Sequence, residues 1–122
     1  MLLIALGGAG GALARHWLSS MLSATPASHF PIGTLSVNVL GSFLIGVMYV
    51  IIVEKGLIHP DWRSVFIIGF LGAFTTFSTF SLEAVTLLEN GHAAMAAGYV
   101  MLSVATCLLG VWLAMVLTRL IW

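Results

Sequence analysis

The sequence predicts an all-α membrane protein with four transmembrane helices, and its composition, hydropathy and charge placement all support this fold class. Of its 122 residues, 61% are hydrophobic and only 7% are charged, whereas about a quarter of the residues are charged in an ordinary soluble domain. The mean hydropathy is +1.15. A transmembrane helix needs about 20 apolar residues, so four helices use about 80. We therefore expect residues 1–122 to form a single transmembrane domain.

The boundaries of the four helices follow from the charged and turn-forming residues, because charged groups are costly in the middle of a bilayer. The expected spans are residues 2–22, 32–53, 63–88 and 93–121. A polar stretch with two prolines separates the first two spans, and a loop containing Lys55, Gly56, Pro60 and Asp61 separates the second from the third. The sequence Glu-Asn-Gly-His at 89–92 precedes the fourth. All three prolines fall in loops, where a missing backbone N–H does no harm.

Short connections make neighbouring helices antiparallel, so both termini are expected on one side of the membrane. Lys55, Arg63 and Arg119 lie on that side and Arg15 lies nearer the other. The excess of basic residues places the termini in the cytoplasm. Because this bias is small, insertion in both orientations and an antiparallel homodimer are physically possible.

Three polar residues are expected at a similar depth inside the bilayer. Arg15 lies seven residues from the end of its span, Asn38 six residues into the next, and Glu83 five residues from the end of the third. At 1.5 Å per residue, each lies roughly 10 Å below the same surface. They form either a shared water-filled vestibule, or a buried Arg15–Glu83 ion pair with Asn38 as an interhelical hydrogen-bonding group.

The third span is unusually rich in residues that weaken a helix. Residues 69–81 contain two glycines, three threonines and two serines. Glycine adds backbone freedom, threonine is β-branched, and both hydroxyl side chains compete for backbone hydrogen bonds. We expect a break near Thr75 and Thr76, in the middle of the bilayer, where freed carbonyls suit a hard cation. The alternative is an intact helix whose hydroxyls bond to the preceding turn.

Phe74, Phe77 and Phe80 recur at every third position and are expected along one stripe of a helix. Such a stripe commonly faces lipid or packs in a core. Alternatively, the positive edges of the rings face a pore and attract a small anion.

The fourth span carries a polar stripe at helical spacing. It is formed by Tyr99, Ser103, Thr106 and Gly110. The stripe either replaces the hydration shell of an ion or forms a helix-packing seam. The pairs Gly7/Gly11 and Ser42/Gly46 have the small-x3-small spacing that allows two helices to approach closely.

Several functional classes are excluded by the sequence. Four basic and four acidic residues give a net charge near zero, so the basic surface of a nucleic-acid-binding protein is missing. No nucleophile–base or carboxylate pairing indicates an enzyme. The histidines are scattered singly, without the spacing of a metal site, and the single cysteine, Cys107, forms no intrachain disulfide.

Three motifs resemble the Fluc (CrcB) family of bacterial fluoride channels. The first is Gly8-x-Gly10-Gly11-x3-Arg15, and the second runs from Gly33-Thr34 through Asn38 to Gly46. The third, Gly69-Phe-Leu-Gly-x2-Thr-Thr-Phe-Ser-Thr-Phe-Ser-x-Glu83, is the most specific. The resemblance covers the whole chain, with the motifs in the expected order.

The resemblance implies a dual-topology antiparallel homodimer with two pores that export fluoride passively through the cytoplasmic membrane and confer fluoride resistance. It implies that the ring edges of Phe77 and Phe80 line the pores with Asn38, and that Arg15 lies in the vestibule. The remaining polar path is formed by Thr79, Glu83, Tyr99 and Ser103. Backbone carbonyls of Gly72 and Thr75 are implied to bind a structural sodium ion on the dimer axis. One departure is Cys107, where the family often has a second serine; Thr106 or a water molecule is the alternative donor there.

Two rival classes fit the length. Small four-helix multidrug exporters are also dual-topology dimers, but proton-coupled cation export requires a deep acidic residue, and the first span offers Arg15 instead. The second rival class is a non-conducting assembly subunit, whose helices are held together by close packing at glycines. The chemistry favours a fluoride channel, because a ladder of amides, hydroxyls and ring edges offers many modest contacts to a small anion.

Overall fold

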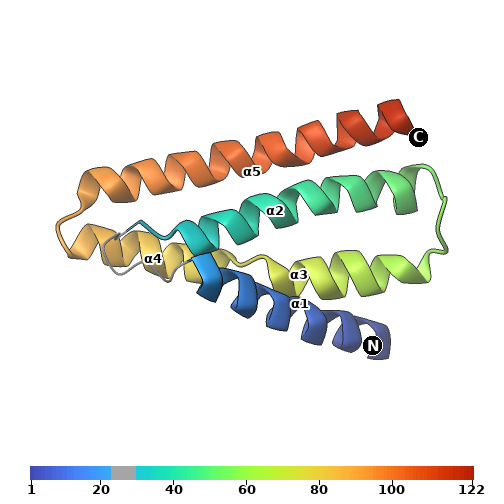
Figure 1. Cartoon of the computed structure of the whole chain (residues 1–122), viewed down its shortest axis with the longest axis horizontal. Coiled ribbons are helices and arrows are strands. Elements are labelled where there is room, and N and C mark those ends of the chain that lie inside the picture. Colours follow the sequence, from blue (N-terminus) through green and yellow to red (C-terminus); the bar gives the residue numbers. More distant parts are fainter. Residues whose placement is uncertain (23–29) are drawn as a thin grey trace.

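The computed structural model describes residues 1–22 and 30–122, which form a bundle of helices without any strand in these two ranges (Figure 1). The first two helical segments are α1 (Leu2–Leu22) and α2 (Ile32–Met48), the latter continuing as the π-helical segment η1 (Tyr49–Glu54). After a loop follow η2 (Arg63–Leu71, π-helical), α3 (Gly72–Phe74), α4 (Phe77–Glu89) and α5 (Ala93–Ile121). The expected helical ranges are thus reproduced to within one residue at their outer ends.

Three continuous helical regions in the described ranges are long and apolar enough to cross a membrane. They are Ile32–Glu54, Arg63–Glu89 and Ala93–Ile121. α1 has 21 residues, but its closely spaced glycines, Arg15 and His16 lower its hydropathy. Its role as a fourth span stays a prediction.

The helices pack in pairs. α2 lies along α5, and α1 lies along η2 and α3. Both chain termini lie at the same end of the bundle, as expected from the short connections (Figure 1).

Glycines allow the close approach within each pair, as their spacing predicted. A Cβ atom on Gly7 would overlap the carbonyl oxygen of Val65, and one on Gly11 would overlap that of Phe70. In the other pair, a Cβ atom on Gly46 would lie 2.7 Å from the carbonyl oxygen of Val111. Any larger residue at these positions would force the helices apart.

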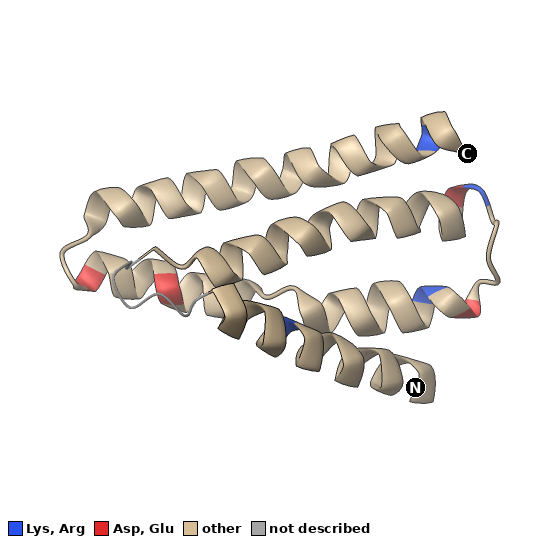
Figure 2. Ribbon diagram, viewed as in Figure 1, with Lys and Arg blue, Asp and Glu red and all other residues tan. Residues whose placement is uncertain are grey.

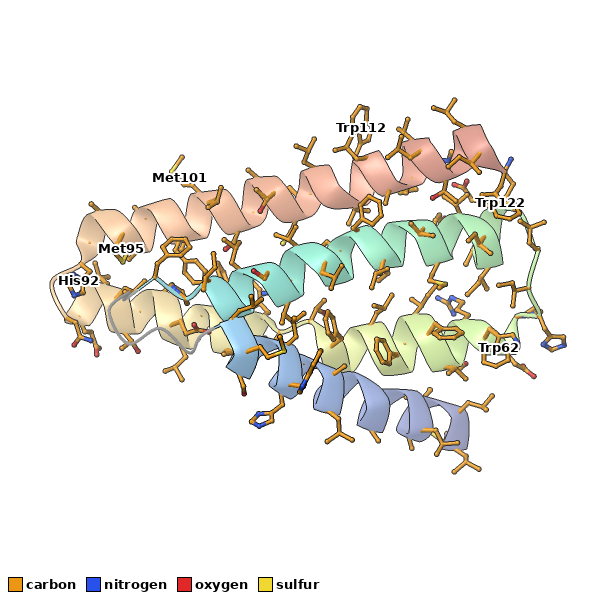
Figure 3. All side chains as sticks on the ribbon, viewed as in Figure 1. Trp62, His92, Met95, Met101, Trp112 and Trp122 are labelled. Atoms are coloured by element: carbon orange, nitrogen blue, oxygen red, sulfur yellow. The ribbon has the colours of Figure 1, made fainter. Side chains whose placement is uncertain are left out.

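Basic and acidic residues lie together at the end of the bundle that holds both chain termini (Figure 2). There Arg119 of α5 donates two hydrogen bonds to the Glu54 carboxylate, one from Nε at 2.9 Å. Trp62 and Trp122 lie at the same end (Figure 3), as is typical of tryptophans at a membrane interface.

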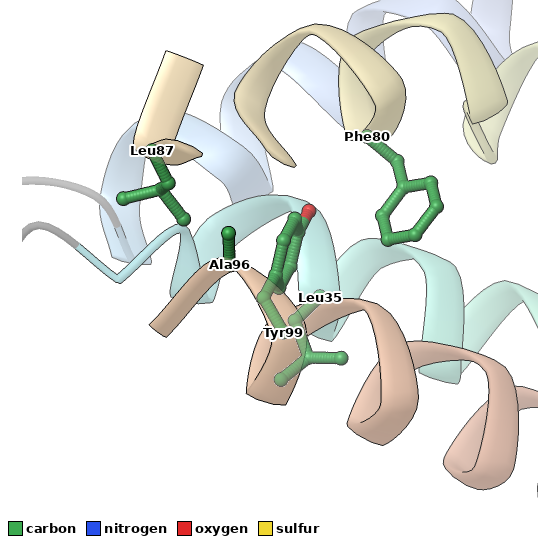
Figure 4. Close-up of a cluster of buried hydrophobic side chains, with 5 residues drawn as sticks. All are labelled: Leu35, Phe80, Leu87, Ala96 and Tyr99. Atoms are coloured by element: carbon green, nitrogen blue, oxygen red, sulfur yellow. The ribbon is translucent and has the colours of Figure 1, made fainter. Parts of the chain in front are cut away.

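A buried hydrophobic cluster joins α2, α4 and α5 at the other end of the bundle (Figure 4). It consists of Leu35, Phe80, Leu87, Ala96 and Tyr99. Tyr99 is fully buried, and its ring lies 5.1 Å from that of Phe80. This cluster fixes the side chain of Phe80 next to the candidate site.

Candidate functional site

The candidate site is built around an interruption between α3 and α4. Helical backbone ends at Phe74 and resumes at Phe77, and the two residues between them are extended, with ψ values of 158° at Thr75 and 122° at Thr76. The hydroxyl of Thr75 donates to the Leu71 carbonyl at 3.0 Å, whereas the Thr76 hydroxyl accepts from the Thr79 N–H at 3.3 Å and so caps α4. Threonine hydroxyls therefore form hydrogen bonds at both ends of the interruption, at the end of α3 and at the start of α4.

Asn38 of α2 holds the interruption through the backbone of Thr76. Its Oδ1 accepts from the Thr76 N–H at 2.8 Å, and its Nδ2 donates to the Thr76 carbonyl at 3.0 Å. One turn further, Gly41 makes room for the same segment, because a Cβ atom there would overlap the side chain of Thr75. Helix α2 thus supplies both the hydrogen bonds and the space that an irregular backbone needs.

The carbonyls of Gly72 and Thr75 are two of those that lose their usual helical donors as a result. In a continuous helix the Thr76 N–H would reach the carbonyl of Gly72, but here it bonds to Asn38. The Thr79 N–H would reach the carbonyl of Thr75, but here it bonds to the Thr76 hydroxyl. Gly72 and Thr75 therefore present backbone oxygens to other partners.

A cavity of about 300 Å³, termed the main cavity because it borders the interruption, lies between α2, α4 and α5. Its walls bring together four of the residues expected in the pore: Asn38, Phe77, Phe80 and Ser103. The hydroxyls of Ser103 and Tyr99 are buried and have no hydrogen-bond partner among the described residues. A buried hydroxyl without a partner is costly, so this region is suited to a small polar guest.

The two phenylalanines that line this cavity differ sharply in exposure. Phe80 is 8% exposed, whereas Phe77 is 78% exposed, although their ring centroids lie only 5.6 Å apart. Phe74 does not continue their stripe, contrary to the sequence-based expectation. It ends α3 on the other side of the interruption, where its buried ring stacks on Phe70 at 5.9 Å.

A second, smaller cavity of about 160 Å³ contains Arg15. Its other lining residues are His16, Ser19, Thr34, Val37, Thr76 and Thr79. Thr34 connects it to Glu83, because the Thr34 hydroxyl donates to the Glu83 carboxylate at 2.5 Å. Thr76 lines both cavities, so both border the interruption.

The expected grouping of Arg15, Asn38 and Glu83 is therefore only partly right. Arg15 and Glu83 are linked through the Thr34 cavity, while Asn38 lines the main cavity and bonds to backbone. No Arg15–Glu83 ion pair forms within residues 1–22 and 30–122. The alternative role for Asn38, an interhelical hydrogen-bonding group, describes its contacts correctly.

The polar stripe of α5 also differs from expectation at its far end. Thr106 is turned to its own helix, where its hydroxyl donates to the Leu102 carbonyl at 2.5 Å. Cys107 lines the main cavity instead. An i, i+4, i+8 series running from Tyr99 through Ser103 to Cys107 thus faces inwards.

Sequence reasoning assigned no individual role to Thr34 or Gly41, although both lie within one of the family motifs. The signal that identifies Thr34 is its spacing, because Thr34, Asn38 and Ser42 step by four along an otherwise apolar helix. Gly41 gave no comparable signal, since its partner is an irregular segment.

The long apolar helices, with two cavities beside an interrupted helix, define a multi-pass membrane protein. Comparison with known proteins identifies the family. The chain belongs to the family described as CrcB-like protein, Camphor Resistance (CrcB), whose match covers residues 2–115.

Similar proteins include three bacterial ones named fluoride-specific ion channel FluC. The protein from Saccharophagus degradans is 55% identical over 97% of this chain and 88% of its own length. The protein from Methylococcus capsulatus is 50% identical over 95% of this chain, which spans 51% of that longer protein. The protein from Hahella chejuensis is 48% identical over 97% of this chain and 93% of its own length.

Proposed function

We propose that the chain is a fluoride-selective channel that lets fluoride leave the bacterial cytoplasm passively and so lowers its toxicity. The observation that carries the proposal is the gathering of Asn38, Phe77, Phe80 and Ser103 around one cavity beside an interrupted helix. The relatives named fluoride-specific ion channels support the choice of ion.

The chemistry of the cavity suits a small anion. An amide, a hydroxyl and the electropositive edges of two aromatic rings offer several modest contacts in place of a hydration shell. No single group binds the ion tightly, which allows it to leave as well as to enter. The membrane potential, negative inside, drives an anion outwards with about 2.3 kcal/mol per 100 mV, so the path requires no energy-coupling site.

Arg15 provides the positive charge of the vestibule in this proposal. Its cavity is small and polar, and Thr76 borders both this cavity and the main cavity. Thr79 and Glu83 extend the path on α4, and Tyr99 and Ser103 extend it on α5. An arginine at the mouth raises the local concentration of anions, while its separation from the phenylalanines prevents it from trapping the ion beside them.

The active form is proposed to be an antiparallel homodimer. Phe77, one of the two pore phenylalanines, is 78% exposed on the single chain, so the pore is open on one side. A second copy would cover this ring and enclose the path. The small charge bias between the two ends of the sequence is compatible with insertion in both orientations.

A sodium ion on the dimer axis is proposed to join the two copies. The carbonyl oxygens of Gly72 and Thr75 fit such an ion, because their usual helical donors bond to Asn38 and to the Thr76 hydroxyl. Carbonyl oxygens are ligands for hard cations. When bound, sodium would supply positive charge that neutralises four converging carbonyl dipoles, two from each copy.

The alternative function, a small multidrug exporter that exchanges cations for protons, has no support from the comparisons. The family and the relatives reported above are not named for drug export.

Ion flux from proteoliposomes tests the proposal. Purified protein in vesicles loaded with fluoride or chloride is diluted into salt-free medium, and an ionophore that carries the counter-cation is added. We expect rapid fluoride release with chloride retained. Retention of fluoride, or equal release of both anions, would overturn the proposed function.

A further inference from the structure

We propose that Cys107 is a covalent modification site inside the conduction path, where a small, neutral thiol-reactive reagent stops ion flow. The inference rests on the proposed function, because it assumes that ions pass through the main cavity.

The position of Cys107 carries the first part of the argument. Its side chain lines the main cavity together with Asn38, Phe77 and Ser103, and it is half-buried rather than open to the surface of the chain. It lies one helical turn beyond Ser103 on the same face of α5. The neighbouring Thr106 has its hydroxyl bonded to the Leu102 carbonyl, so the thiol, and not that hydroxyl, borders the cavity.

A second and independent observation points to a guest in this part of the cavity. Ser103 is only 5% exposed, and its buried hydroxyl has no hydrogen-bond partner in the described part of the chain. A water molecule or an ion beside that hydroxyl would supply the missing partner. Because Ser103 and Cys107 both line the main cavity, such a guest would lie beside the thiol.

The size of the cavity sets the class of reagent. A volume of about 300 Å³ corresponds to roughly ten water molecules at ~30 Å³ each. A methylthio group enters such a space, whereas a large charged reagent is excluded. Once attached one turn from Ser103, the group places apolar surface where an anion needs donors.

Methyl methanethiosulfonate is the probe. The Cys107 thiol loses a proton to water, and the thiolate attacks the sulfenyl sulfur of the reagent. An S–S bond forms to the methylthio group, the S–SO₂ bond breaks, and methanesulfinate leaves with the electron pair. The reagent is itself the electrophile, so no other oxidant is needed, and dithiothreitol reverses the modification.

The experiment uses the full chain in fluoride-loaded proteoliposomes. Because Cys107 is the only cysteine, mass spectrometry reports its modification without ambiguity. We expect one methylthio group per chain, a loss of fluoride flux of tenfold or more, and recovery after dithiothreitol. Added fluoride is expected to slow the labelling.

Two variants serve as controls, each compared with its own untreated flux. Cys107→Ser is expected to be insensitive to the reagent. Cys107→Ser combined with Leu120→Cys moves the thiol to a residue that is 78% exposed near the end of α5, and it is expected to be labelled without loss of flux.

Three results would overturn the inference alone: labelled protein that conducts normally, a thiol that reacts only after denaturation, or inhibition that persists in Cys107→Ser. If the untreated protein passes no fluoride, the proposed function itself fails and the inference fails with it. The flux measured before treatment therefore separates the two failures.

Discussion

Replacing Asn38 by alanine tests how the interruption between α3 and α4 is stabilised. The Asn38 amide satisfies the N–H of Thr76 and contributes one hydrogen bond to its carbonyl. Thr76 is only 9% exposed, so bulk water does not replace these bonds freely. We expect Asn38→Ala to destabilise the folded chain.

The magnitude follows from the two groups that lose a partner. The Thr76 N–H is left without an acceptor, which costs about 1–3 kcal/mol for a buried group. The Thr76 carbonyl keeps its helical donor at the start of α4 and loses one bond worth about 0.5–1.5 kcal/mol. The expected loss is therefore about 1.5–4.5 kcal/mol, with water in the adjacent cavity favouring the lower half of this range.

The assay is equilibrium unfolding in mixed micelles with increasing dodecyl sulfate, followed by circular dichroism. Asn90→Ala is the matched control, since it removes the same side chain from an exposed turn at the end of α4. Asn38→Asp keeps the volume and one acceptor but loses the donor to the Thr76 carbonyl, so we expect a loss at least as large as that of Asn38→Ala at neutral pH.

The reasoning would be refuted if Asn38→Ala were as stable as Asn90→Ala. It would also be refuted if Asn38→Asp had the stability of the original protein, because the volume of the side chain, and not its hydrogen bonds, would then hold the interruption.

Three further predictions concern the pore, the helix seam and the ion. Phe80→Ile is expected to lower fluoride flux at least tenfold while the protein elutes in size-exclusion chromatography as the unchanged protein does; unchanged flux would contradict the ring-edge role. Gly11→Ala is expected to destabilise the folded chain by about 1–3 kcal/mol, because the added Cβ atom would overlap the carbonyl of Phe70. The control Gly98→Ala, where nothing lies within 4 Å of the added atom, is expected to stabilise the chain by about 0.5–1 kcal/mol. Equal effects of the two changes in the same unfolding assay would exclude close helix packing at Gly11. Replacing sodium by a large organic cation is expected to lower the melting temperature of the proposed dimer in detergent. A melting temperature independent of sodium would remove the carbonyl site.

The helix boundaries could be predicted from sequence because they depend on local and one-dimensional properties. Charged and turn-forming residues end each apolar run, and the observed α5 (Ala93–Ile121) begins and ends where the charges indicated. The density of threonine, serine and glycine in residues 69–81 indicated where helical backbone would be weakest. The structure has extended backbone at Thr75 and Thr76.

The partners across helices could not be predicted in the same way. Depth along a helix placed Arg15, Asn38 and Glu83 at one level but gave no information about rotation around each axis. Asn38 consequently faces the backbone of Thr76 rather than Arg15. Similarly, the three-residue spacing of the phenylalanines assumed a continuous helix, and two extended residues after Phe74 are enough to remove it from the stripe.

The interruption between α3 and α4 explains why backbone N–H groups with hydrogen-bond partners lie next to carbonyl oxygens that have lost theirs. Ending α3 at Phe74 releases backbone groups from helical pairing, and nearby side chains satisfy two of the released N–H groups: Asn38 binds that of Thr76, and the Thr76 hydroxyl binds that of Thr79. Both interactions consume N–H donors and leave carbonyl oxygens without their helical donors. In the proposed function these oxygens bind a cation, while the anion passes through the main cavity, which Ser103, Phe77 and Phe80 border. One irregular turn would then serve both the proposed cation site and the proposed anion path, because its N–H groups are satisfied by α2 and by its own cap.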